Sequence, residues 1–197
     1  MAEFTIEGLI LSVGYFAIFS CMFANGLSGL PSSPLVYLTA GIVILSGGLE
    51  WLPTIFLGTL GNVLGNIALY ELVRQKGFAW VVKQGWLSQK YMATIAQVRK
   101  AFELQGVKIV LIGKFVPMVK VVVPIVAGVA KMHRLMFVMA VSVTSAVWAT
   151  VSVGYGYYFG RIVNSGDTTW IAGVTLLSIP LVVWWFLRHI QTLQVDR

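Results

Sequence analysis

Charged residues are scarce in this chain. They make up 11% of its 197 residues, against roughly 25% in a typical soluble domain, while hydrophobic residues make up 58% and the mean hydropathy is +0.85. Cysteine is scarcer still, since Cys21 stands alone. An intramolecular disulfide and a cysteine-ligated metal cluster are therefore excluded. The low charge predicts that lipid, and not water, surrounds most of the folded chain.

Acidic residues are few, with seven Asp and Glu against 14 Lys and Arg, for a net charge of +7. The cations lie between long apolar runs and form no single basic and aromatic patch, so we expect no nucleic-acid partner. The N-terminus has Glu3 and Glu7 where a signal or transit peptide needs basic residues. We therefore expect the first apolar run to stay in the mature protein.

Catalytic signatures are missing as well. The sequence has no nucleophile elbow, metal-binding His pair, P-loop or dinucleotide fingerprint. We expect a protein that is not an enzyme and that uses no cofactor or metal.

Long apolar runs dominate the sequence. A spanning helix needs roughly 20 apolar residues to cross about 30 Å of hydrocarbon. Four segments meet this requirement: Phe4–Ala24, Trp51–Val73, Leu135–Gly160 and Trp170–Leu187. Gly61 with Gly65, and Gly156 with Gly160, have the four-residue spacing that lets membrane helices approach closely. The expected fold class is therefore all-α, with one polytopic membrane domain over residues 1–197.

Two further apolar stretches are broken by proline. Pro31–Leu49 keeps too few unbroken apolar residues after Pro34 to form a span. Val107–Ala130 is interrupted by Lys114, Pro117, Lys120 and Pro124. Because proline removes a backbone donor and disrupts the preceding turn, we expect each stretch to be a re-entrant segment. Two kinked ordinary spans are the alternative.

The placement of Lys and Arg predicts the topology. Residues 25–49 contain none, whereas residues 74–108 contain seven. By the positive-inside rule the central segment is cytoplasmic, and with two re-entrant segments both termini are cytoplasmic as well. Within the central segment, Phe78–Phe102 mixes aromatic residues with lysines, which predicts amphipathic helices on the inner leaflet. A partner-binding or solvated helical linker is the alternative.

The two halves carry a weak internal repeat. An offset of 87 residues superposes Ala40-Gly41 on Ala127-Gly128, Tyr70 on Tyr157 and Arg74 on Arg161. In both halves a broken segment precedes a spanning helix, and the predicted topology gives the two copies opposite orientations. Inverted repeats with a discontinuous helix in each half are typical of secondary transporters, whose substrate site lies where the broken segments meet.

Lys114 and Lys120 are the strongest candidates for substrate binding. A cation deep in a membrane segment costs at least about 2.5 to 3.5 kcal/mol unless it is paired or hydrated. The two lysines flank Pro117, so a turn there would direct both ammonium groups into one cavity. Lysine binds phosphate as a mobile point charge, which predicts a ligand with an anionic phosphate headgroup. The alternative is that both side chains snorkel to the cytoplasmic interface.

The first half adds polar candidates for the same site. Ser32 and Ser33 offer hydroxyl groups beside two prolines, where they either cap a helix or help to cradle an anion. Asn66, Tyr70 and Arg74 follow at spacings of about one helical turn.

Two carboxylates are candidates for ion coupling. Glu71 is expected to pair with Arg74 across one turn, near the inner surface. Both Glu71 and Glu50 lie near predicted helix ends, where water is close.

One motif is more specific than the rest: Gly113-Lys114-Phe115-Val116-Pro117-x-x-Lys120-x-x-x-Pro124-x-x-Ala127-Gly128. Together with Pro31–Gly41 and the run Gly65-Asn66-x-x-x-Tyr70-x-x-x-Arg74-x-x-Gly77, it resembles the DedA family, also called the VTT or SNARE-associated domain family. The resemblance runs from about residue 10 to residue 190. It implies a lipid transporter, because bacterial members return undecaprenyl phosphate across the cytoplasmic membrane and eukaryotic relatives scramble phospholipids.

The chain departs from the family pattern in two ways. Lys114 and Lys120 stand where the family has arginines, which keeps the charge but loses the bidentate fork. Ala24 and Ser33-Pro34 stand where the family usually has acidic residues. These departures put a proton-coupled mechanism in doubt and favour a divergent subfamily or a different lipid.

The combined expectation is a flippase for a phosphate-bearing lipid, with undecaprenyl or another polyprenyl phosphate as the first candidate. The substrate-binding set is expected to be Lys114, Lys120, Pro117, Pro124, Ser32, Ser33, Asn66, Tyr70 and Arg74. Membrane lipids are the expected partners, and a homo-oligomer is compatible with the sequence. The alternatives are a nonselective phospholipid scramblase, a membrane scaffold or assembly factor without transport activity, and a small-ion exchanger.

Overall fold

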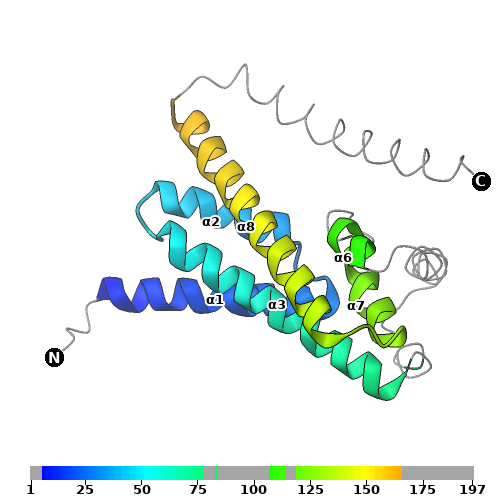
Figure 1. Ribbon diagram of the computed structural model, residues 1–197. Helices are drawn as coiled ribbons and strands as arrows, with labels where there is room; N and C mark the ends of the chain where they lie inside the picture. The colour runs from blue at the N-terminus through cyan, green and yellow to red at the C-terminus, as the bar shows by residue number, and fades with distance from the viewer. Residues whose placement is uncertain (1–5, 78–82, 84–106, 114–118, 166–197) are drawn as a thin grey trace, which may run out of the picture.

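The computed structural model describes residues 6–77, 83, 107–113 and 119–165, and these form helices and the turns between them (Figure 1). The helices are α1 (Ile6–Ser28), α2 (Ser33–Leu45), α3 (Trp51–Lys76), α6 (Val107–Gly113), α7 (Val119–Val129) and α8 (Arg134–Ser165). The expected span Trp170–Leu187 lies outside the described residues. So do Lys114, Pro117 and, apart from Lys83, the expected amphipathic region Phe78–Phe102.

The helices α3 and α8 are both long and apolar enough to cross a membrane. They contain 26 and 32 residues, and at 1.5 Å per residue either exceeds the roughly 30 Å of a hydrocarbon core. The predictions of helices over Trp51–Val73 and Leu135–Gly160 are confirmed. The helix α3 continues for three residues beyond its predicted end and stops at Gly77, which has a φ of +77° that suits glycine.

The broken segments form shorter helices, as expected. With 13 residues, α2 is about 20 Å long and cannot cross the hydrocarbon alone. In the second segment, a Cβ added to Gly113 would lie 2.7 Å from Cγ2 of Val123, although a continuous helix would hold these two residues about 15 Å apart. The helices α6 and α7 are therefore in contact and do not form one straight helix; Figure 1 shows α6 above α7.

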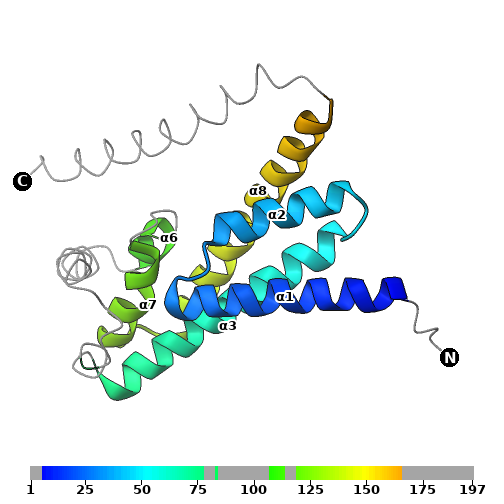
Figure 2. The ribbon, with the colours of Figure 1, turned by 180° about the vertical axis from the view of Figure 1, so that it is seen from behind.

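The helix α1 runs in the same direction as α3. The Tyr15 hydroxyl accepts a hydrogen bond from the Glu50 amide, just before α3 begins. Further along, Gly61 of α3 faces the Phe19 carbonyl and Gly65 faces the Phe23 carbonyl. The expected topology needs these two helices to run in opposite directions, with α1 leaving the cytoplasm and α3 returning to it. That part of the prediction is wrong, because α1 and α3 run parallel along their contact, while α2 runs in the opposite direction to α1 (Figure 2).

Each short helix packs on the long helix of the other half. In α2, a Cβ added to Gly41 would lie 2.6 Å from the Tyr157 amide of α8. In α7, a Cβ added to Gly128 would lie 2.8 Å from the Tyr70 carbonyl of α3. The offset of 87 residues relates Gly41 to Gly128 and Tyr70 to Tyr157. The two contacts are therefore reciprocal, as across a two-fold axis.

Glycines allow these close crossings, as their spacing predicted. Gly156 faces the Leu38 carbonyl across the contact between α2 and α8, while Gly160 lies against the side chains of Leu45 and Ile42. Backbones can approach this closely only where no Cβ intervenes.

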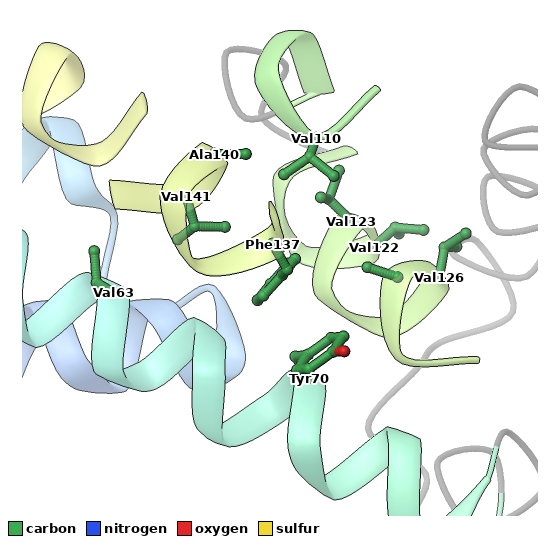
Figure 3. Packing of buried hydrophobic residues seen from close by; sticks show 10 residues of the cluster. Val63, Tyr70, Val110, Val122, Val123, Val126, Phe137, Ala140 and Val141 are labelled. Carbon is green, nitrogen blue, oxygen red and sulfur yellow. The ribbon is translucent and has the colours of Figure 1, made fainter. Parts of the chain in front are cut away.

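The largest buried cluster lies where α3, α6, α7 and α8 converge (Figure 3). The Tyr70 and Phe137 rings stack there with centroids 4.4 Å apart, and Val110 and Val122 are fully buried beside them. By contrast, large apolar side chains such as Leu52, Phe56 and Tyr158 are more than 60% exposed on the long helices. Such an outer surface suits lipid and not water.

Candidate functional site

The two broken segments meet at Ser33 and Lys120. Lys120 Nζ donates a hydrogen bond of 3.2 Å to Oγ of Ser33. Ser33 is buried at the first turn of α2, and Lys120 is half-buried at the start of α7. The two broken segments are therefore in contact at Lys120, while Lys114 lies outside the described residues. The substrate-binding role of both lysines stays a prediction.

This junction can accept an anion. A lysine ammonium has three N–H donors, of which Ser33 takes one. The other two have no partner among the described residues, and an ammonium in apolar surroundings needs such partners. Phosphate oxygens would supply them with charge-assisted hydrogen bonds.

Two prolines shape the backbone around the junction. Pro124 lies inside α7 and has no amide, so it cannot donate the helical hydrogen bond to the Lys120 carbonyl. Pro34 lies in the first turn of α2, where a missing amide is tolerated. Ser32 occupies the N-cap position of α2, but its side chain makes no capping hydrogen bond within the described structure. Ser33 is not the N-cap residue of α2, and its hydroxyl oxygen instead accepts the hydrogen bond from Lys120.

A buried amide network joins α1, α3 and α8 next to this junction. Asn62 is its centre: Nδ2 donates to Oδ1 of Asn25 at 3.0 Å, while Oδ1 accepts from Asn66 Nδ2 and Ser145 Oγ at 3.1 Å each. Asn25 in turn donates to the Pro31 carbonyl at 2.6 Å. The network thereby anchors the turn that leads into Ser33.

The network includes one predicted site residue, Asn66, and adds residues that sequence reasoning missed. The Asn66 side chain donates to the carbonyl and to Oδ1 of Asn62, while its substrate-binding role stays a prediction. Asn25, Asn62 and Ser145 are each less than 10% exposed. The sequence does contain a signal for these residues, because an amide side chain inside an apolar run needs a hydrogen-bond partner in the fold.

Tyr70 and Arg74 hold the turn between α7 and α8. The Tyr70 hydroxyl donates to the Met132 carbonyl, and Arg74 Nη1 donates both to the Tyr70 hydroxyl and, at 2.7 Å, to the same carbonyl. No described contact joins either side chain to Lys120. They therefore fix the end of α7, and their substrate-binding role stays a prediction.

The two carboxylates lie away from the junction. Glu71 forms a two-pronged ion pair with Arg134, with Nε to Oε1 at 2.8 Å and Nη2 to Oε2 at 3.1 Å. The expected Glu71–Arg74 pair is therefore wrong, because Arg74 turns to Met132. Glu50 is exposed at the N-cap of α3. Neither carboxylate has a described contact with Lys120.

The family model of the VTT domain matches residues 30–158, which include both lysines of the motif, all of α3 and most of α8. This chain belongs to the VTT-domain family. The resemblance to the DedA family is confirmed, and the match covers well over half of this VTT-domain protein.

Named relatives share about a third of its residues or fewer. The inner membrane protein YghB of Escherichia coli K12 is 32% identical over 157 residues, covering 78% of this chain and 71% of YghB. The inner membrane protein YqjA of the same strain is 28% identical over 151 residues, covering 75% of this chain and 68% of YqjA. The uncharacterized membrane protein slr0232 of a Synechocystis strain is 26% identical over 161 residues, covering 81% of this chain and 73% of slr0232. No solved structure matches the chain.

Proposed function

We propose that this VTT-domain protein is a flippase that moves a phosphate-bearing lipid across the cytoplasmic membrane. The observation that supports it most is the Lys120 ammonium at the junction of α2 and α7. A cation there costs at least about 2.5 to 3.5 kcal/mol unless a ligand, water or partner compensates it. One serine hydroxyl compensates only part of that cost, and an anionic headgroup would compensate the rest.

The fold supports a site that opens to both sides in turn. In this proposal α1–α2 and α6–α7 are two re-entrant hairpins, and α3 and α8 are the spanning helices that follow them. The reciprocal contacts of Gly41 and Gly128 support an inverted repeat whose axis passes near Ser33 and Lys120. Rocking of one half against the other would then expose a headgroup alternately to each side.

The location of the protein is part of the proposal. YghB and YqjA are named inner membrane proteins, and the family match supports the same membrane for this chain. The basic segment after α3 favours a cytoplasmic position for the Arg74 end of that helix. Because α1 and α3 are parallel, α1 then begins on the opposite side, which revises the expected cytoplasmic N-terminus. A return through Trp170–Leu187 keeps the C-terminus cytoplasmic.

The proposed substrate is undecaprenyl or another polyprenyl phosphate. Lys120, together with Lys114, would hold the phosphate, and the hydroxyl groups of Ser32 and Ser33 would complete the cradle. Lysine lacks the bidentate fork of arginine, so the site would recognise charge more than headgroup shape. The nonselective scramblase is therefore the second candidate.

Ion coupling is a separate question from headgroup binding. Glu50 and Glu71 are the carboxylates proposed for it, and Glu71 would have to leave Arg134 to take part. The chain has no acidic residue at Ala24 or Ser33, so an uncoupled flippase is the simpler mechanism.

Reconstitution of the purified protein in phosphatidylcholine vesicles tests the function. Fluorescent polyprenyl phosphate and fluorescent phosphatidylcholine are added in parallel, and the fraction in the outer leaflet is followed by quenching, with protein-free vesicles as the control. A flippase for phosphate lipids accelerates the first lipid only. Equal acceleration of both would favour the scramblase. Movement of neither, with a stoichiometric partner co-purifying, would favour a scaffold.

A further inference from the structure

The two arms of the first hairpin enclose an apolar groove. It has a volume of about 480 Å³ between α1 and α2. Its walls include Gly14, Ala17 and Cys21 from α1 and Leu35, Thr39 and Val43 from α2. In both views α1 and α2 run side by side in opposite directions (Figures 1 and 2).

The groove exists because the two arms are held by different partners. The helix α1 packs chiefly on α3, and α2 packs chiefly on α8, so the arms touch each other little. Gly14 and Ala17 are too small to fill the space between them. The second hairpin differs, because Val110 of α6 and Val123 of α7 are buried together in one cluster. The small side chains on α1 and the separate partners of its two arms thus leave a hollow in the first hairpin.

The lining of the groove requires an apolar occupant. The Thr39 hydroxyl donates to the Leu35 carbonyl of its own helix at 2.8 Å, so it has no donor left for a ligand. Leu35 is 66% exposed and the remaining named walls are apolar or weakly polar. A hydrocarbon chain fits such a surface, whereas a headgroup would leave polar atoms unpaired.

The groove has a closed end and an end next to the candidate headgroup site. Leu49 closes one end, where its Cδ2 would lie 3.3 Å from a Cβ at Gly14. The other end lies at Val36 and Cys21, and Val36 lies about one turn from Ser33 on the same face of α2. Between Leu35 and Val43 the groove follows α2 for about 12 Å. A chain that starts at Ser33 would thus enter the open end and stop at Leu49.

We infer that this groove holds the first part of the hydrocarbon tail of the lipid whose phosphate lies at Lys120. The inference rests on the proposed function for the headgroup, and it adds a site that selects the tail. Because hydrocarbon in the groove exchanges one apolar contact for another, the site acts by shape and favours a single slender chain next to the phosphate.

Photo-cross-linking locates the tail directly. The probe is phosphatidic acid with a diazirine in the upper part of one acyl chain, incorporated into phosphatidylcholine vesicles with the wild-type protein. Peptide mapping by mass spectrometry is expected to place most adducts on residues 14–21 and 35–43. The sole cysteine gives a second readout, since long-tailed phosphatidic acid should slow maleimide labelling of Cys21 several-fold, whereas a short-tailed analogue should not.

A groove-filling variant and a matched control distinguish loss of tail binding in the groove from a general effect of adding a bulky side chain. Ala17→Phe should reduce cross-linking in the groove at least several-fold and shift translocation toward short-tailed lipids. Val143→Phe introduces the same side chain at a position of α8 that is 59% exposed, and it should change neither. Lys120→Ala should remove the protection of Cys21 if headgroup and tail bind as one ligand.

The outcomes distinguish this inference from the proposed function. Adducts spread evenly over α3 and α8, with translocation intact, would overturn the groove and leave the flippase standing. Adducts concentrated in the groove, with no translocation, would support the tail site and contradict the flippase. Capture of a second copy of the chain through Cys21, with no lipid adduct, would also overturn the inference.

Discussion

Ser33 and Lys120 are hydrogen-bonded to each other and are separated by 87 residues, the same offset that relates Gly41 to Gly128 and Tyr70 to Tyr157. In a two-fold arrangement only residues near the axis contact their own equivalents. In the inverted repeat that we propose, this pair would lie near the axis. One half supplies a hydroxyl at the contact and the other supplies an ammonium.

The crossing of α2 and α8 should not tolerate a side chain at Gly156. In Gly156→Ala the new methyl group would collide with the Leu38 backbone, so we expect a loss of about 1 to 3 kcal/mol in the free energy of unfolding. Gly154→Ala is the control, because a Cβ there meets nothing within 4 Å. It should be neutral or stabilising by up to about 1 kcal/mol. Denaturant unfolding in detergent micelles measures both, and equal effects would contradict the packing described.

The amide network should depend on its central residue. Asn62→Ala removes the partner of Asn25, Asn66 and Ser145 at once, and we expect it to cost about 1 to 3 kcal/mol. Thr150→Ala is the control, since that exposed hydroxyl bonds only to the carbonyl four residues earlier in α8. Unfolding in micelles is again the measurement. A neutral Asn62→Ala would mean that the network does not anchor the turn before α2.

The turn after α7 should loosen when Tyr70 loses its hydroxyl. Tyr70→Phe keeps the stack on Phe137 but removes one donor to the Met132 carbonyl. The expected loss of about 1 kcal/mol should speed hydrogen exchange of the amides near Met132 by roughly fivefold. Tyr155→Phe, at an exposed position, should leave that exchange unchanged. Unaltered exchange in Tyr70→Phe would remove the tyrosine from this role.

Two arginines should differ in their contribution to stability. Arg134 is 64% exposed in its ion pair with Glu71, so Arg134→Ala should cost no more than about 1 kcal/mol, and salt should erase the difference. Arg74 is half-buried on the Met132 carbonyl, so Arg74→Ala should cost about 1 to 3 kcal/mol at any salt concentration. The melting temperatures of both variants in detergent, at low and high salt, test this ranking. A larger loss in Arg134→Ala than in Arg74→Ala would refute it.

The sequence predicted the helices and their breaks because both depend on local composition. The length of an apolar run set the extents of α3 and α8, and proline set the limits of α2 and α7. The meeting of Ser33 and Lys120 also followed, since a repeat with broken segments implies where the two copies converge.

Long-range geometry was harder to predict. Apolar runs do not encode direction, so the parallel course of α1 and α3 had no local signal. The Glu71–Arg134 pair joins residues 63 positions apart. Arg74 is nearer to Glu71 in the sequence, but its guanidinium is hydrogen-bonded to the Met132 carbonyl. The Asn62 network was missed because its members come from α1, α3 and α8, and no local pattern shows which side chains of different helices meet.

The rate of headgroup translocation in Lys120→Ala tests the central claim most directly. Losing a charge-assisted hydrogen bond of about 1.5 to 3 kcal/mol should slow a polyprenyl phosphate by at least about tenfold, while Lys120→Arg should keep most of the rate. Lys76→Ala, which removes an exposed lysine at the end of α3, should behave as wild type. An unchanged rate in Lys120→Ala, with wild-type protein active in the same vesicles, would contradict the account.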